Sequence, residues 1–321
     1  MDQPVVQIRD LRTYFYTYEG VVKAIEGVDL DIMSHEILGL VGETGCGKSV
    51  TALSIMRLIY YPPGKIVSGK ILLHGEDLVV KSEREMSKIR GEKMAMIFQD
   101  PMSSLNPVKK IGEMMTEVIR LHLGVSRKEA QRRAVASLAE TEMPDPSYVL
   151  KQYPHELSGG MRQRVMIATA ISLKPELLIA DEPTTALDVT IQAQILRLLK
   201  KLKENLKVAI LIITHNLGVV AQLCDRVAVM YAGEIVEVGT VEDIFERPAH
   251  PYTLGLIRAI PRMDEKGDRL VGIEGNIPNL IDPPTGCRFH PRCGFFHAKC
   301  RMEKPNFRNL NQSHWVACHQ R

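Results

Sequence analysis

The sequence lacks a long apolar run, since no stretch reaches the ~18 residues that a helix needs to cross a bilayer. It has little net charge, formally +3 over 321 residues, which is too small to favour a nucleic-acid partner. The first residues, Met1-Asp2-Gln3-Pro4, lack the basic start and apolar core of a secretory signal. We therefore expect a protein of the cytosol, or one held on the cytosolic face of a membrane by partner proteins.

Close cysteine pairs are also lacking. Four of the six cysteines fall between residues 287 and 318 with the spacing C-x5-C-x6-C-x17-C, without the C-x2-C pairs that zinc sites favour. A reducing cytosol disfavours disulfides, and four thiolates on loops suit a [4Fe–4S] cluster, which takes one cysteine per iron. Zinc and free or disulfide-bonded cysteines are the alternatives. The expected cluster ligands are Cys287, Cys293, Cys300 and Cys318.

A phosphate-binding loop pattern, G-x-x-x-x-G-K-[ST], occupies residues 42–49, between an apolar run at 36–41 and a predicted helix at 50–58. Its glycines let backbone N–H groups approach a polyphosphate, and the N-terminus of the helix adds partial positive charge. Lys48 can reach the β- and γ-phosphates, and the Ser49 hydroxyl can hold Mg²⁺. The predicted nucleotide contacts are Gly42, Glu43, Thr44, Gly45, Cys46, Gly47, Lys48, Ser49 and Val50.

Predicted strands alternate with helices, which indicates an α/β domain with a largely parallel sheet. Short strands are expected at 5–11 and 28–32 with tyrosine-rich turns between them, and a hairpin is expected through Ala232-Gly233. From about 107 to 154 there is no strand signal, so this stretch is interpreted as a helical insertion. After about residue 247 the composition shifts to Pro, His, Arg and Cys. We therefore predict a main domain at 1–247 and a small, loop-rich metal-cluster domain at 248–321.

Asp181 and Glu182 follow the apolar run Leu177-Leu178-Ile179-Ala180. A carboxylate at the end of a buried strand, downstream of a phosphate loop, is placed to bind Mg²⁺, and the next carboxylate can polarise an attacking water. The alternative is an acidic pair that faces solvent at the end of a strand.

A family resemblance follows from Leu157-Ser158-Gly159-Gly160, which resembles the signature loop of ATP-binding-cassette (ABC) ATPases, although Met161 stands where many members have Gln. The other family motifs occur in order between residues 42 and 215. Gln99 resembles the glutamine of the Q-loop, Asp188 the aspartate of the D-loop and His215 the histidine of the H-loop.

The resemblance implies an ABC fold with a parallel-sheet core, an antiparallel β subdomain and a helical insertion. It implies ATP hydrolysis with Glu182, His215 and Gln99 as catalytic residues, and Mg²⁺ held by Ser49, Gln99 and Asp181. It also implies a head-to-tail dimer, in which ATP is contacted from the other subunit by Ser158, Gly159, Gly160 and Asp188. For the serine and glycines, a plain helix cap is the alternative. An aromatic residue, Phe15 or Tyr16, is expected to stack on adenine.

The C-terminal part carries a second resemblance. His250-Pro251-Tyr252-Thr253-Leu254 and Cys287-Arg288-Phe289-His290-Pro291-Arg292-Cys293 are similar to the extension of ATPase subunits from oligopeptide and dipeptide importers. This implies two transmembrane permease subunits, a second ATPase subunit and, indirectly, an extracellular substrate-binding protein. The helical insertion would dock on the permeases, with Met114 and Met115 as candidate contacts unless they form a core stripe.

Other functions stay open at this point. Importers of nickel, sugars or glutathione share the cassette, and soluble ABC clamps of DNA repair or translation form a different class. We also expect the C-terminal domain to be independent of the phosphate loop, so that loss of its cysteines leaves ATP binding intact.

Overall fold

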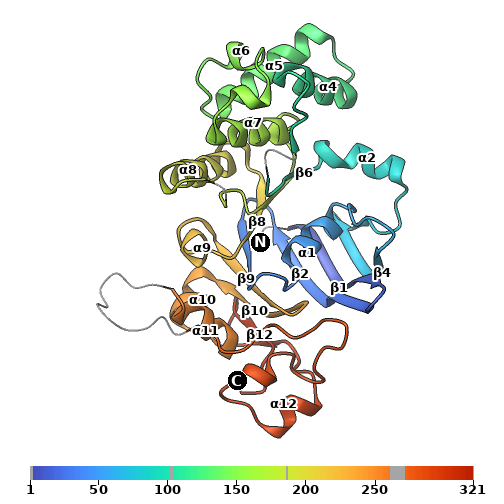
Figure 1. Cartoon of the computed structure of the whole chain (residues 1–321), viewed down its shortest axis with the longest axis vertical. Helices are drawn as coiled ribbons and strands as arrows, with labels where there is room; N and C mark the ends of the chain where they lie inside the picture. Colours follow the sequence, from blue (N-terminus) through green and yellow to red (C-terminus); the bar gives the residue numbers. More distant parts are fainter. Residues whose placement is uncertain (1–2, 101–103, 186, 261–271, 321) are drawn as a thin grey trace. The chain divides into compact units, whose positions relative to one another are not determined.

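The computed structural model describes residues 3–100, 104–185, 187–260 and 272–320 (Figure 1). The chain divides into two compact units, and each is described by itself. Unit 1 comprises Met1–Val5, Met33–Glu36 and Lys81–Ile212, and unit 2 comprises Val6–Ile32, Ile37–Val80 and Ile213–Arg321. The predicted boundary at residues 247 and 248 stays a prediction.

Unit 1 is mainly helical, as the absence of strand signals predicts for residues 107–154. Its strands β6 and β7 pair in parallel, with Met94 opposite Leu177. β8 lies next to β7 in strand order, and its residues 209–212 belong to this unit. The elements are α2 (Glu83–Glu92), β6 (Met94–Ile97), α4 (Ile111–Leu123), α5 (Arg127–Glu140), α6 (Pro146–Val149), α7 (Gly159–Ile171), β7 (Leu177–Asp181), α8 (Val189–Leu206) and β8 (Ala209–Thr214), with a 3₁₀ turn at Pro154–Glu156.

The apolar face of helix α4 belongs to the core of the helical insertion. Ile111, Met115 and Ile119 recur every four residues and are fully buried. Met115 therefore cannot serve as a surface contact, because the core stripe takes it, while Met114 is half-buried. The exposed apolar side chains of this region are others, among them Leu121 at 79% exposure.

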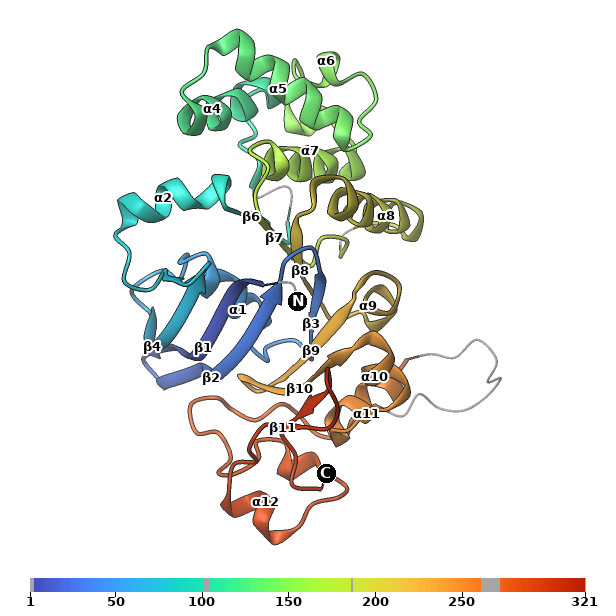
Figure 2. The same ribbon diagram turned by 180° about the vertical axis from the view of Figure 1, so that it is seen from behind.

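Unit 2 contains an antiparallel sheet in the order β2-β1-β4-β5, with helix α1 (Lys48–Ile55) beside it (Figure 2). The strands are β1 (Pro4–Thr17), β2 (Gly20–Met33), β4 (Gly64–Leu73) and β5 (Glu76–Asp77). The tyrosine-rich stretch is strand rather than turn, because β1 pairs with β4 as far as Phe15 opposite Gly64. The prediction of short strands with tyrosine-rich turns was therefore wrong.

The second sheet of unit 2 contains β3 (Ile37–Val41), which pairs in parallel with β9 (Arg226–Tyr231). The predicted hairpin is confirmed: β9 pairs with β10 (Glu234–Thr240), and Ala232 and Gly233 both have positive φ, 48° and 85°, as a tight two-residue turn requires. Short strands from the end of the chain extend the sheet, since β12 (Trp315–Val316) pairs with β10, and β11 (Arg308–Asn309) pairs with β12.

The C-terminal region shares a core with this hairpin. The rings of Tyr231 and Tyr252 lie 4.6 Å apart, and Phe289 lies 5.1 Å from Tyr231 and 5.4 Å from Tyr252. All three side chains are buried. The remaining elements of unit 2 are α9 (Leu217–Leu223), α10 (Val241–Glu246), α11 (Pro251–Arg258), α12 (Ala298–Met302) and a 3₁₀ turn at His290–Arg292. Apolar burial therefore anchors the region on the hairpin.

A buried carboxylate ties the same region to β10. Glu237 is fully buried, and its carboxylate accepts hydrogen bonds from the backbone N–H groups of Ala249 (2.7 Å) and His250 (2.9 Å). The His314 ring nitrogen Nε2 lies 2.6 Å from the same carboxylate. Within the part of the chain that the structure describes, no helix has the length and apolar character to cross a membrane.

Candidate functional site

The phosphate loop joins the fully buried strand β3 to the N-terminus of α1. Two positions of the loop require glycine, because the backbone of neighbouring segments comes close to them. A Cβ on Gly42, which has φ 154°, would lie 2.1 Å from the Met230 carbonyl oxygen, and one on Gly47, with φ 111°, would lie 2.7 Å from the Ala24 carbonyl oxygen. The loop therefore packs tightly against neighbouring backbone at the N-terminus of α1, the end of a helix that favours anions.

Lys48 is held inside this loop. Its ammonium donates hydrogen bonds to the carbonyl oxygens of Gly42 (2.8 Å) and Glu43 (3.0 Å), and the residue is 6% exposed. Cys46 beside it is fully buried, and burial raises the pKa of its thiol. Lys48 is thus the cation of the loop, and Cys46 is a packed neutral thiol rather than a nucleophile.

A cavity of about 530 Å³ opens beside the loop, and the predicted H-loop histidine lines it. His215 follows β8, and the next residue, Asn216, caps α9 by accepting a hydrogen bond from the Gly218 N–H (2.9 Å). The sequence did not predict the C-terminal part of the lining. The lining residues are Gly42, Glu43, Thr44, His215, Leu217, Leu256, Gly275, Asn276 and Ile277.

The structure brings Gln99 and Glu182 together in unit 1. Asp181 ends β7 and is 6% exposed. The Glu182 carboxylate accepts hydrogen bonds from the Gln99 side-chain amide and the Thr185 hydroxyl, both at 2.9 Å. These two donors orient the carboxylate, as a base that positions a water molecule requires.

The signature and D-loop residues start two helices of unit 1. Ser158 caps α7 by accepting a hydrogen bond from the Met161 N–H (3.3 Å), and Asp188 caps α8 by accepting one from the Ile191 N–H (2.9 Å). Gly159 and Gly160 are the first residues of α7. The Ser158 side chain is exposed, so its role as a cap leaves its hydroxyl accessible. Ala186 of the D-loop motif lies outside the described residues.

The two candidates for adenine stacking differ in packing. A Cβ on Gly64 would lie 2.7 Å from the Phe15 ring, so this ring already covers strand β4. The Tyr16 side chain is 48% exposed and is the more accessible of the two rings.

The four C-terminal cysteines are free thiols. Burial, and more weakly the neighbouring thiols of Cys318, Cys300 and Cys293, raise the pKa of Cys287 to about 11. The Cys287 N–H donates to the Cys300 carbonyl (2.8 Å). Within the described ranges, however, no three or more His, Cys, Asp or Glu side chains are arranged to hold a metal ion. The expected metal-cluster domain is therefore not shown.

The C-terminal region and the phosphate loop are not independent, contrary to the expectation from the sequence. The Glu43 N–H donates to the Tyr252 hydroxyl (2.8 Å), and Arg292 binds the Glu43 carboxylate. Tyr252 and Arg292 lie in motifs that carry the family resemblance, but nothing in the spacing of those motifs indicates a contact with Glu43.

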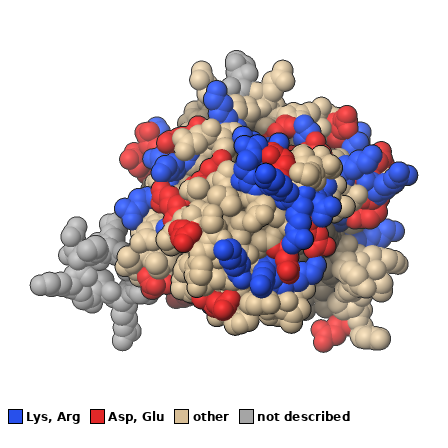
Figure 3. Space-filling view, turned by 90° about the horizontal axis from the view of Figure 1, so that it is seen from above, with Lys and Arg blue, Asp and Glu red and all other residues tan. Residues whose placement is uncertain are grey.

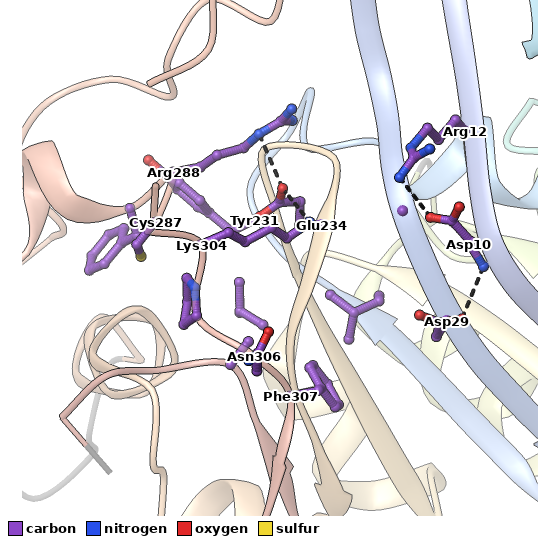
Figure 4. Close-up of a pocket in the computed structure, with 16 residues that line it drawn as sticks. Asp10, Arg12, Asp29, Tyr231, Glu234, Cys287, Arg288, Lys304, Asn306 and Phe307 are labelled. Carbon is purple, nitrogen blue, oxygen red and sulfur yellow. Dashed lines mark hydrogen bonds and ion pairs between the residues drawn. The ribbon is translucent and has the colours of Figure 1, made fainter. Parts of the chain in front are cut away.

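A second cavity in unit 2, of about 330 Å³, lies between the antiparallel sheet, the hairpin and the C-terminal loops (Figure 4). Its charged side chains pair with one another. Arg12 lies 2.9 Å from Asp10, and Glu234 lies 3.4 Å from Arg288 and 2.9 Å from Lys304. The two pairs of Glu234 link the C-terminal region to the hairpin.

Together, a phosphate loop, a strand-end carboxylate pair, a glutamine and a serine-glycine helix start define an ABC-type ATPase, and comparisons with known proteins agree. A family model described as "ABC transporter" matches residues 25–185, and one described as "Oligopeptide/dipeptide transporter, C-terminal region" matches residues 236–300.

Curated relatives match the chain over nearly its full length. A probable peptide ABC transporter ATP-binding protein of Sinorhizobium fredii is 50% identical, covering 98% of this chain and 94% of its own. The oligopeptide transport ATP-binding protein AppD of Bacillus subtilis is 49% identical, covering 98% and 96%.

Among solved structures, the dimeric ATP-binding cassette MJ0796, described as bound to ADP and Pi, matches with a TM-score of 0.66 and 27% identity, covering 74% of this chain and 98% of that one. The chain therefore belongs to the ABC transporter ATP-binding proteins, in the branch with the oligopeptide/dipeptide C-terminal region, and it is an ATPase.

Proposed function

We propose that this ATPase powers the import of dipeptides or oligopeptides through partner membrane subunits. The observation that carries the proposal is the match of the C-terminal region to peptide transporters, together with identities of 48–50% to peptide-transport ATP-binding proteins over 98% of the chain. Those relatives are named for peptide, oligopeptide or dipeptide transport.

The reaction is transfer of the γ-phosphoryl group of ATP to water. The phosphate loop and Lys48 bind the phosphates, and the dipole of α1 adds to the positive potential. Ser49, Gln99 and Asp181 would hold Mg²⁺, which neutralises charge on the phosphates. The Glu182 carboxylate polarises the attacking water, in the orientation set by its bonds from Gln99 and Thr185.

Other residues complete the nucleotide site. His215 would face the bound nucleotide, since it lines the cavity that Gly42 and Glu43 also line. Tyr16 is the better candidate for stacking on adenine because Phe15 is packed against Gly64.

The working form is a head-to-tail dimer with a copy of itself or a homologous subunit. Ser158 at the start of α7 is exposed, and a helix start of this kind can bind an anion. A chain with one phosphate loop therefore has a second phosphate-binding element, which a nucleotide held by another subunit would use. Ser158, Gly159, Gly160 and Asp188 would contact ATP held by the other subunit. The resemblance to a dimeric cassette supports this arrangement.

The helical insertion is the surface that docks on two permease subunits. Its exposed apolar side chains include Val108 (79%), Leu121 (79%) and Tyr148 (59%), and these replace Met115 as candidate contacts. Gln99 would link the nucleotide to that surface. The protein would thus act on the cytoplasmic face of the membrane, and an extracellular binding protein would deliver peptide to the permeases.

The four C-terminal cysteines would hold a [4Fe–4S] cluster that stabilises their loops. The thiols of Cys318, Cys300 and Cys293 all influence the pKa of Cys287, and four neighbouring thiols suit a group that takes one cysteine per iron. Zinc and free or disulfide-bonded cysteines are the alternatives, and among the described residues no three or more His, Cys, Asp or Glu side chains are arranged to hold a metal ion. The cluster would supply cross-links within the region.

The alternatives predict other substrates or partners. A nickel, sugar or glutathione importer uses the same cassette, and a soluble clamp would bind nucleic acid. Figure 3 shows a face on which Lys and Arg are interspersed with Asp and Glu, which does not attract a polyanion as a basic field would.

The test is ATP hydrolysis by the complete transporter in proteoliposomes. Binding protein loaded with a dipeptide or oligopeptide should stimulate hydrolysis, while nickel, sugar or glutathione should not. Stimulation by one of those three alone would contradict the proposal.

A further inference from the structure

Glu43, the residue after Gly42 in the phosphate loop, is bound by two side chains from the C-terminal region. Arg292 Nη1 lies 2.7 Å from Glu43 Oε2, and Arg292 Nη2 lies 3.1 Å from Oε1. The Tyr252 hydroxyl accepts a hydrogen bond from the Glu43 N–H at 2.8 Å. Both the side chain and the backbone of this loop residue are therefore fixed from outside the loop.

Arg292 is itself held in place. Its Nε donates to the Glu274 carbonyl (2.9 Å), its Nη2 donates to the Ile273 carbonyl (3.1 Å), and the Tyr231 hydroxyl lies 3.4 Å from Nη1. The side chain is only 5% exposed. A planar guanidinium with a bidentate carboxylate partner and two carbonyl acceptors has few other positions available.

These contacts also place the neighbouring C-terminal segment. Residues 273 and 274, which Arg292 binds, lead directly into Gly275, Asn276 and Ile277. Those three residues line the cavity of about 530 Å³ that Glu43 and His215 also line. One arginine thus joins the wall of the cavity to the start of the loop.

Tyr252 has an equally fixed position. It is fully buried and packs against Tyr231 and Phe289, with ring centroids 4.6 Å and 5.4 Å away. Its hydroxyl is therefore presented to Glu43 by a rigid aromatic core rather than by a mobile side chain.

A glycine-rich loop loses conformational freedom when it closes around phosphates, and that loss opposes binding. Contacts that order the loop beforehand reduce the loss. We propose that Arg292 and Tyr252 are positioning residues for ATP, which hold Glu43 and so make the C-terminal region part of the nucleotide site. The proposal rests on the binding of ATP to this phosphate loop.

The test is a double-mutant cycle on the full-length chain, with the Kd of a fluorescent ATP analogue as the readout. Arg292→Gln and Glu43→Gln should each raise the Kd about tenfold, which corresponds to about 1.4 kcal/mol. The double variant should bind no worse than either single variant, because both remove the same ion pair. Unchanged Kd values in the single variants, or multiplied losses in the double variant, would overturn the proposal.

Two further variants separate positioning from general loosening of the fold. Tyr252→Phe keeps the packed ring and removes the acceptor for the Glu43 N–H, so it should raise the Kd severalfold at unchanged Tm. Arg247→Gln is the matched control, because this arginine pairs with Glu242 and Asp243 in α10, and its Kd should equal that of the wild type. A Kd raised as much by Arg247→Gln as by Arg292→Gln would also overturn the proposal.

Lys48→Ala distinguishes this proposal from the assignment of the ATP site itself. It should abolish binding of the analogue whatever the state of Arg292. Wild-type binding by Lys48→Ala would refute the ATP site, whereas loss in Lys48→Ala with wild-type binding in Arg292→Gln and Tyr252→Phe would refute only the positioning role.

Discussion

Glu182 illustrates chemistry at the scale of a residue. It follows strand β7 with φ 45°, a left-handed conformation that costs a residue other than glycine about 1–3 kcal/mol and is frequent at functional sites. Hydrogen bonds from Gln99 and Thr185 converge on one oxygen of its carboxylate. The backbone strain and the two donors together aim a carboxylate that the strand end alone would leave free to rotate.

We predict that Glu182→Gln keeps ATP binding and lowers turnover by about 10²–10⁴-fold, the usual contribution of a general base. The phosphate contacts remain while the group that positions water is lost, so an ATP-bound dimer should accumulate in size-exclusion chromatography. Glu142→Gln is the control, since this exposed carboxylate pairs with Lys201. Hydrolysis by Glu182→Gln at the wild-type rate would refute the assignment of the base.

At the scale of elements, the C-terminal region is more closely joined to the cassette than its sequence indicates. Its strands extend the sheet through β10, its aromatic rings pack on the hairpin, and its arginine binds the phosphate loop. Elements that are too short to form a core alone gain stability from such shared burial.

Local patterns predicted most elements, and they indicated the candidate site residues, whose roles stay predictions. The phosphate loop, the hairpin and the helices of the insertion follow from glycine, turn and apolar spacing. The strand over residues 14–17 was not predicted because it is stabilised by long-range pairing with β4, which outweighs the turn that this tyrosine-rich stretch suggests. The strand β12 has only two residues and so shows no periodicity. The ion pair between Arg292 and Glu43 joins residues far apart in the sequence, so neither feature could be predicted from local pattern.

The cysteine loops provide a prediction at this scale. Protein purified without oxygen should be brown, with a broad absorption near ~400 nm and about four irons per chain, as cysteine-ligated clusters show. Cys293→Ser should bleach the colour and expose the C-terminal region to protease. Because Cys293 follows Arg292, we now expect the variant to bind ATP more weakly, in place of the independence that the sequence suggested. Stoichiometric zinc with less than one iron per chain would contradict the cluster.

Helix α11 gives a prediction on pH dependence. His250 is 1% exposed, and burial lowers its pKa from the ordinary value of 6.5 to about 3. Between pH 3 and pH 6.5 the folded state therefore binds fewer protons than the unfolded state. The stabilisation by the neutral His250 ring is complete above pH 6.5 and is lost as the pH falls toward 3.

Burial of this residue should lower the free energy of unfolding by at most about 1.4 kcal/mol for each unit by which the pH falls. His250→Asn keeps a side chain that can accept from the Tyr252 N–H, and should make the slope of unfolding free energy against pH shallower below pH 6.5. His155→Asn, at an exposed position, should not. Identical slopes in wild type and His250→Asn would contradict the burial of a neutral ring.

At the scale of the whole molecule, the proposed composite ATP site requires two subunits. Ser158→Arg should leave the ATP affinity of the single subunit nearly unchanged and prevent ATP-dependent dimer formation, since a bulky cation at the start of α7 occupies the space for the other subunit's nucleotide. Analytical ultracentrifugation with ATP measures the populations of monomer and dimer. Loss of ATP binding by the monomeric variant would show that Ser158 acts within its own subunit.

The central claim is that ATP hydrolysis by this chain drives peptide import, and uptake of a labelled dipeptide measures it most directly. Proteoliposomes with the permeases, the binding protein and wild-type ATPase should accumulate peptide only when ATP is supplied on the side of the ATPase. The same vesicles with Glu182→Gln should accumulate none while still binding ATP. Equal uptake with the variant, or with ATP omitted, would contradict the claim.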